Sequence, residues 1–186
     1  MSRSLLIPML LAATLSAGPA LGQPQPAAPD KAEAETAERI ANGARFGAWT
    51  VTCEAVAVDE TACVLSQRLV RSSGSTFLAE LLAFWNADRS RSYLAARVPI
   101  GVFFPSGFVL KPEGSEERFE FVWQACSREL CEALLEIDME KLGAVDAARE
   151  AVIGYRPGLR AEPLVFKTGT NGVVEGLEAL RAAMRK

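Results

Sequence analysis

The sequence contains no histidine. Histidine is the commonest general base, the commonest zinc ligand and the usual side chain that titrates near neutral pH. Its absence excludes the Ser-His and Cys-His nucleophile systems, and neither a Gly-x-Ser-x-Gly elbow nor a phosphate-binding glycine loop replaces them. We therefore predict no catalytic residue, no cofactor site and no metal site, and we expect that the protein is not an enzyme.

The sequence also lacks a basic stripe and, beyond its first residues, an apolar run long enough to cross a bilayer. Its 20 basic and 23 acidic residues give a formal charge of −3. Nucleic acid is therefore not an expected partner. We expect a protein or another envelope component as partner, and no transmembrane segment in the mature chain.

The N-terminus has the organisation of a cleavable signal peptide. Arg3 precedes an apolar run from Leu5 to Leu15, and the small residues Ala20 and Gly22 occupy the positions that signal peptidase reads. The alternative is an N-terminal membrane anchor, but the run is shorter than the roughly 20 residues that span a bilayer. We predict a signal peptide over 1–22, cleavage after Gly22 and a periplasmic or secreted protein.

Residues 23–44 form a second compositional segment, rich in proline, alanine and glutamate. Its first half disfavours both helix and sheet because proline removes backbone donors. We predict a flexible linker over 23–44, followed by a single β-rich domain over 45–186.

Alternation with a period of two dominates from residue 45 onward. The clearest runs are 49–53, 63–69 and 119–123, with a shorter one at 93–98. Residues 77–85 fit either a helix or a fully buried strand. Helical spacing favours a short helix near 138–149 and a C-terminal helix from Val173, with Thr170 or Asn171 as its N-cap. The predicted fold is an antiparallel β-sandwich with a C-terminal α-helix.

Four cysteines allow three pairings. The short separations favour disulfides between Cys53 and Cys63 and between Cys126 and Cys131. A zinc site made of all four cysteines is the alternative, but the first pair is spaced more widely than zinc ligands usually are. Neither pair has the Cys-x-x-Cys spacing of a redox motif.

Two clusters are candidates for chemistry or binding. Glutamates 113, 116, 117 and 120 could supply paired carboxylates for glycoside hydrolysis. A solvated turn is favoured over catalysis because the sequence from Lys111 to Ser115 is typical of a turn. Three phenylalanines, Phe103, Phe104 and Phe108, lie among prolines and glycines. They either close one end of the core, which we favour, or form an exposed loop that contacts a partner or a membrane surface.

Several motifs resemble those of one bacterial family. The run from Phe46 to Cys53 resembles the Phe-Gly-x-Trp-x-Val-x-Cys opening of the invasion-associated locus B family, and Cys63 and Gln67 match its next cysteine and glutamine. The segment from Val98 to Val102 resembles its Val-Pro-Leu-Gly-Val turn, and 121–133 resembles its strand with a short cysteine pair. The similarity covers the chain from about Arg45 to the C-terminus.

The resemblance implies a small exported bacterial domain, mainly β, without a known catalytic site. The family is named after a protein linked to bacterial entry into host cells. We therefore expect an exported, non-enzymatic binding or accessory protein of the bacterial envelope. The alternatives are a hydrolase that uses the carboxylates of Glu113–Glu120 and a purely structural envelope component.

Overall fold

The computed structural model describes residues 40–58 and 60–183. The predicted signal peptide over 1–22 and residues 23–39 of the predicted linker lie outside this part. The described elements, in chain order, are β1 (Arg45–Phe46), β2 (Trp49–Ala57), β3 (Glu60–Val70), β4 (Phe77–Trp85), β5 (Ser92–Pro99), the 3-10 turn η1 (Phe104–Ser106), β6 (Phe108–Pro112), β7 (Phe119–Cys126), β8 (Leu130–Ile137), α1 (Met139–Ala147), β9 (Glu150–Tyr155), β10 (Leu164–Gly169) and α2 (Val173–Ala183).

The end of the predicted linker belongs to the folded unit. The Gly43 N–H donates to Val51 O and the Val51 N–H donates to Ala44 O, each at 2.8 Å. The Cys53 N–H donates to the Asn42 side chain at 3.1 Å. Residues 42–44, the last three of the predicted linker, therefore lie along the edge of β2.

All strand pairs are antiparallel and form one ten-stranded sheet, in the order β1-β2-β3-β4-β5-β8-β7-β6-β9-β10. The sheet changes direction at β7, whose first residues, 119–121, pair with β6 while residues 122–126 pair with β8. The strands β1 to β5 and β8 lie on one side of β7 in the sheet order, and β6, β9 and β10 lie on the other. Two hydrogen bonds connect these two parts of the sheet. Thr168 Oγ1 donates to Gln67 Oε1 at 2.7 Å, and the Tyr155 hydroxyl donates to Leu78 O at 2.9 Å. The predicted antiparallel β-sandwich is confirmed, and its two layers are parts of one curled sheet.

The ambiguous run at 77–85 is strand β4. Ala79, Leu81, Ala83 and Trp85 are buried in the core between the layers, as alternation requires. Leu82 is also buried, but it lies outside that core cluster, on the opposite face of the strand. Burial on both faces produces a continuous apolar run, which explains why periodicity could not distinguish this strand from a helix.

Both predicted helices are present. Asp138 caps α1, where its Oδ1 accepts the Lys141 N–H at 2.8 Å. The α2 end differs from the prediction, because the Val173 N–H donates to Asp146 Oδ1 of α1 at 2.9 Å. The hydroxyl of Thr170, a predicted cap, is buried and has no hydrogen-bond partner among the described residues. Of the helices described, neither is long and apolar enough to cross a membrane.

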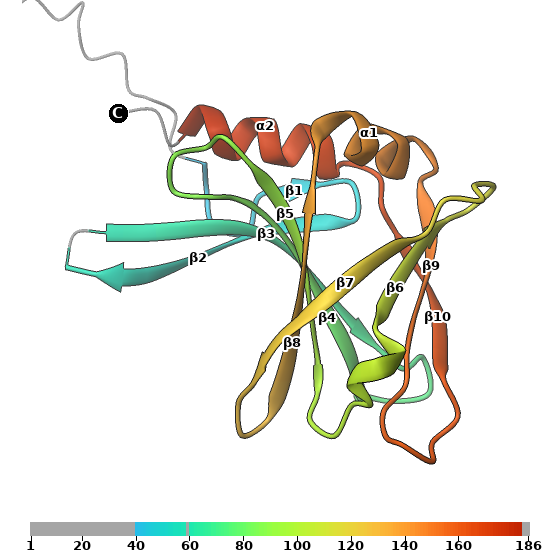
Figure 1. Cartoon of the computed structure of the whole chain (residues 1–186). Helices are drawn as coiled ribbons and strands as arrows, with labels where there is room; N and C mark the ends of the chain where they lie inside the picture. Colours follow the sequence, from blue (N-terminus) through green and yellow to red (C-terminus); the bar gives the residue numbers. More distant parts are fainter. Residues whose placement is uncertain (1–39, 59, 184–186) are drawn as a thin grey trace, which may run out of the picture. The chain divides into compact units, whose positions relative to one another are not determined.

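The helices and a group of loops lie at opposite ends of the sheet (Figure 1). Helix α2 packs on β4 through the Trp85 indole N–H, which donates to Leu177 O at 2.8 Å. The loops after β5, β7 and β9 lie at the other end, at the bottom of Figure 1. The largest fully buried side chains fill the space between: Phe108, Leu65, Leu110, Leu142, Ile153, Leu177 and Leu180.

Candidate binding surface at the loop end

The cysteines form the two short pairs that their spacing predicts. Cys53 and Cys63 are direct partners in the β2–β3 ladder, with Cα atoms 4.0 Å apart. Cys126 and Cys131 join β7 to β8, with Cα atoms 3.9 Å apart. Both pairs are at disulfide-bonding distance. Each cysteine pairs with a partner in its own hairpin, an arrangement that disfavours the alternative of a zinc site made of the four cysteines.

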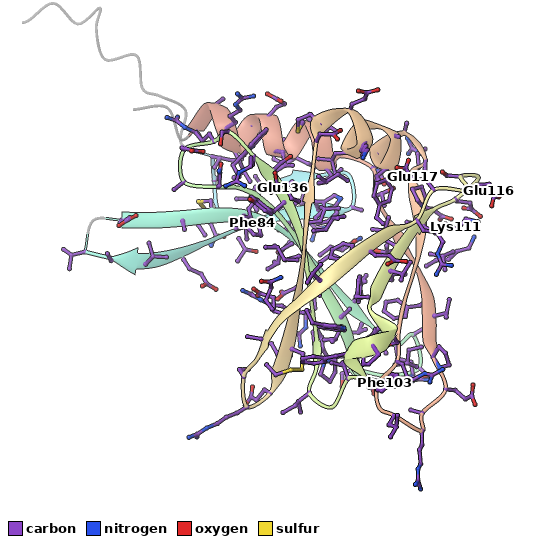
Figure 2. The ribbon with its side chains drawn as sticks, viewed as in Figure 1. Phe84, Phe103, Lys111, Glu116, Glu117 and Glu136 are labelled. Atoms are coloured by element: carbon purple, nitrogen blue, oxygen red, sulfur yellow. A yellow bond between two sulfur atoms is a disulfide. The ribbon has the colours of Figure 1, made fainter. Side chains whose placement is uncertain are left out.

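The glutamate cluster is spread over an exposed turn and the outer face of β7 (Figure 2). Glu113 Oε1 lies 2.8 Å from Lys167 Nζ, and Glu116 Oε2 lies 3.4 Å from Lys111 Nζ. The hydrogen bond from Lys167 lowers the pKa of the Glu113 carboxyl. A general acid in glycoside hydrolysis needs a raised pKa. The geometry therefore favours solvated ion pairs over paired catalytic carboxylates.

The three phenylalanines have different environments. Phe108 is fully buried, because it begins β6 in the middle of the sheet and packs edge-on against Phe121 with ring centroids 5.1 Å apart. Its proposed role in binding a partner is therefore wrong. Phe103 is half-buried, with the Arg156 guanidinium 5.8 Å from its ring centroid. Phe104 is 47% exposed and stacks on Trp123 with centroids 5.6 Å apart.

Backbone hydrogen bonds hold three loops together around Phe103 and Phe104. The Ile100 N–H donates to Glu129 O, and the Phe103 N–H donates to Arg156 O, each at 2.9 Å. The β3–β4 loop lies at the same end, where β4 begins beside Tyr155. We call this surface the loop end and define it as residues 71–76, 100–107, 127–129 and 156–163.

The loop end combines exposed apolar side chains with arginines. Ile100, Phe104 and Leu159 are 56%, 47% and 66% exposed. The loop end has four arginines and two glutamates: Arg71, Arg128, Arg156, Arg160, Glu129 and Glu162. Sequence reasoning identified Phe103 and Phe104 but missed Ile100, Leu159 and the arginines, because these lie on loops that only the fold brings together.

An open groove of about 420 Å³ runs beside η1, between Phe104 and the outer face of β6 and β7. It exists because β6 pairs with β7 only up to Phe121, so that β7 continues without a partner on that side. Two buried donors at this end, Trp123 Nε1 and Arg156 Nε, have no hydrogen-bond partner within the described part of the chain. The groove is lined by residues 104–107, Val109, Arg118 and residues 120–123.

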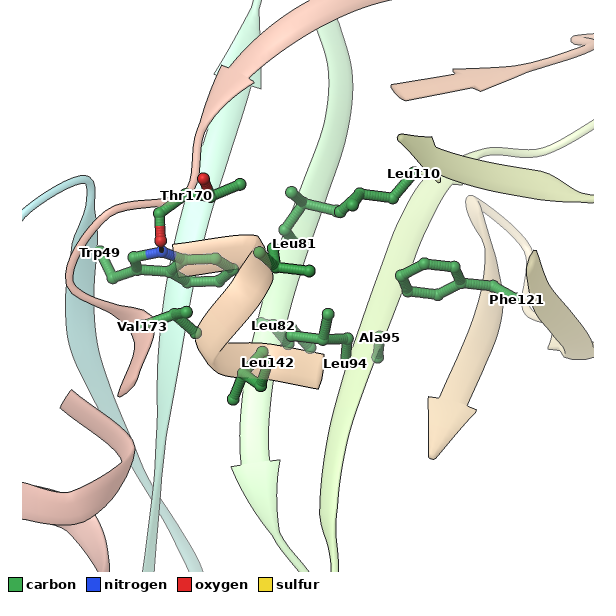
Figure 3. A pocket seen from close by; sticks show the side chains of 11 residues that line it. Trp49, Leu81, Leu82, Leu94, Ala95, Leu110, Phe121, Leu142, Thr170 and Val173 are labelled. Atoms are coloured by element: carbon green, nitrogen blue, oxygen red, sulfur yellow. Dashed lines mark hydrogen bonds between the residues drawn. The ribbon is translucent and has the colours of Figure 1, made fainter. Parts of the chain in front are cut away.

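A second, enclosed cavity lies in the core between the sheet and the helices (Figure 3). Its volume is about 10 Å³, close to the minimum that holds one water molecule. Its lining is apolar except for Thr170, whose carbonyl accepts the Trp49 indole N–H at 3.2 Å. The cavity is therefore a packing defect, too small for a ligand.

The motif residues that carry the family resemblance converge on the segment between β10 and α2. Beyond the Trp49 hydrogen bond, the Ala48 N–H donates to Asn171 O at 3.0 Å. Gln67 binds the Thr168 hydroxyl, and a methyl group on Gly47 would overlap the Asn171 carbonyl. These contacts join β2 and β3 to the end of β10 and to the segment that precedes α2, so these motif residues have a structural role.

The sequence profile described as Invasion associated locus B (IalB) protein matches residues 49–181. The chain belongs to the invasion-associated locus B family. A crystal structure of invasion-associated protein B from Bartonella henselae is similar to this chain, with a TM-score of 0.61 and 18% sequence identity. The match covers 75% of this chain and 94% of the Bartonella chain. No curated protein matches.

The Bartonella structure supports the fold of this IalB-family chain. The mainly antiparallel β architecture and the C-terminal helix, expected from the sequence, are confirmed. The IalB profile spans β2 to α2 and includes the whole loop end.

Proposed function

We propose that this IalB-family chain is an exported, non-enzymatic binding or accessory protein of the bacterial envelope, which contacts its partner through the loop end. Export is supported by the predicted signal peptide and by the two disulfides, which persist in oxidising compartments. The exposed ion pairs of Glu113 with Lys167 and of Glu116 with Lys111 weigh against the hydrolase alternative.

The observation that carries the proposal is the convergence of three loops around Phe103 and Phe104. Exposed apolar side chains that stand singly on a surface need no explanation, but a group rimmed by charged residues marks an interaction site. Here Ile100 and Leu159 are both exposed. The loop that carries Ile100 is joined to the loop that carries Leu159 by the hydrogen bond from the Phe103 N–H to Arg156 O. Aromatic and arginine side chains are also the types enriched at interfaces.

Site-specific photo-crosslinking in intact cells tests the proposal. A photoreactive residue is placed at Leu159 of the loop end or, as a matched control, at Val165 on β10, because these side chains are 66% and 64% exposed. We expect crosslinks to envelope protein or lipid from position 159 and few from 165, and we expect Phe104→Ser to reduce them.

Two outcomes contradict the proposal. One is an equal yield of crosslinks from both positions. The other is turnover of a substrate that is lost when Glu117 or Glu120 is changed to glutamine, because that result would establish the hydrolase alternative.

A further inference from the structure

The loop end differs in charge from the rest of the chain. It contains four arginines and two glutamates, whereas the whole chain has 20 basic and 23 acidic residues. The loop end therefore carries a formal charge of +2 (four arginines minus two glutamates), while the 16 basic and 21 acidic residues elsewhere give −5. An anionic surface would repel most faces of the molecule and attract this one.

The apolar side chains of the loop end stand on separate loops. Ile100 follows β5, Phe104 begins η1 and Leu159 lies between β9 and β10. Protein hot spots instead cluster in well-packed pockets that need a shape-complementary partner. A group of exposed side chains drawn from several loops fits a deformable lipid interface, which accommodates each of them without such a match.

The backbone holds these side chains in place before any partner binds. The disulfide from Cys126 to Cys131 closes the hairpin that carries Arg128. The Ile100 and Phe103 hydrogen bonds fix the neighbouring loops. Preorganisation of this kind reduces the entropy that is lost on binding.

The loop end also offers accessible hydrogen-bond donors. Arg71, Arg128 and Arg160 are exposed. Arginine binds phosphate oxygens in a bidentate geometry. These arginines therefore suit a ligand that presents phosphate groups.

We propose that the loop end docks on an anionic lipid bilayer, with Ile100, Phe104 and Leu159 inserted at the interface and the arginines on headgroup phosphates. This inference rests on the proposed function and names its partner as the membrane surface. Attachment is peripheral and reversible, because it combines a few apolar side chains with electrostatic attraction.

Vesicle sedimentation of the full mature chain tests the inference. Vesicles of phosphatidylcholine and phosphatidylglycerol (3:1) are compared with vesicles of phosphatidylcholine alone. We expect binding only to the anionic vesicles, weakening as salt is raised from about 50 to about 300 mM because screening shortens the reach of surface charges. Arg128→Gln with Arg160→Gln should weaken binding by about 25-fold, since each arginine near an anionic surface contributes about fivefold.

Matched variants distinguish the contribution of the loop end to vesicle binding from the effect of the protein's net charge. Arg45→Gln with Lys141→Gln changes the same net charge away from the loop end and should leave binding unchanged. Leu159→Ser should weaken binding, whereas Val165→Ser, at similar exposure, should not. Unchanged near-ultraviolet circular dichroism verifies that each variant is folded.

Absence of binding, equal binding to neutral vesicles or equal losses in the paired variants would overturn the lipid inference. If vesicles are not bound but position 159 crosslinks to a protein, the loop-end function stands and its partner is a protein. If the crosslinks are also absent, both proposals fail.

Discussion

Gly172 gives the sharpest test of how the first strands are joined to the last helix. Its φ is +90°, a backbone conformation that residues other than glycine rarely adopt. A Cβ atom there would lie 2.7 Å from the Gly47 nitrogen and closer still to the Phe46 carbonyl. Because these neighbours are backbone atoms of the β1–β2 turn, they cannot move aside as a flexible side chain would.

We expect Gly172→Ala to lower the free energy of unfolding by about 2–5 kcal/mol. The left-handed conformation costs about 1–2 kcal/mol and the overlap about 1–3 kcal/mol. Gly114→Ala is the matched control, because its φ is +77° but nothing lies within 4 Å of the added methyl group. It should lose only the conformational contribution, about 1–2 kcal/mol.

A third glycine-to-alanine variant should have the opposite effect on the free energy of unfolding. Gly143 lies inside α1 with open space around it, so Gly143→Ala should stabilise the protein by about 0.4–1 kcal/mol. Urea unfolding followed by tryptophan fluorescence measures all three variants. Equal losses for Gly172→Ala and Gly114→Ala would refute the argument, because the backbone contact would then contribute nothing.

Three further predictions concern the two disulfides, the N-cap of α2 and the ion pair between Lys167 and Glu113. Replacing both cysteines of a pair by serine should cost about 2.7 kcal/mol for Cys53–Cys63 and about 2.1 kcal/mol for Cys126–Cys131, since sequence separations of 10 and 5 set the loop-closure entropy; a larger loss for the second pair in urea unfolding would contradict this ordering. Asp146→Ala should cost about 0.5–2 kcal/mol by removing the cap of α2, while Asp146→Asn should retain most of it; the idea fails if the two variants unfold alike. Lys167→Met should lower Tm more at about pH 7 than at about pH 3. The pKa of Glu113 is lowered in the folded state, so the ion pair with Lys167 stabilises the protein fully above the ordinary carboxyl pKa of 4.5 and is lost as pH falls through the folded pKa. At high pH the same ion pair is lost again, because the pKa of Lys167 is raised in the folded state and the lysine loses its proton as pH rises through that pKa, above 10.5. A Tm difference that is the same at every pH would exclude the ion pair as its cause.

The local features of this fold could be predicted because each depends on a short stretch of sequence. Alternation indicated β2, β3, β5 and β7, and helical spacing indicated α1 and α2. The cysteine pairs followed from their separations, and the motif around Trp49 indicated the family.

Other features were decided only by the tertiary structure. Strands β9 and β10 were not predicted, because their boundaries depend on pairing with β6 and with each other. The cap of α2 comes from Asp146, 27 residues before Val173, so no neighbouring residue indicates it.

The candidate site shows the same division. Phe103, Phe104 and Phe108 share one stretch rich in proline and glycine, and no local pattern separates them. The curled sheet places Phe108 between β7 and β9 in the core, whereas η1 leaves Phe104 at the surface. Local sequence therefore indicated four of the strands, both helices and both cysteine pairs. Only long-range pairing decided which side chains face solvent together, because exposure depends on neighbours that are distant in the chain.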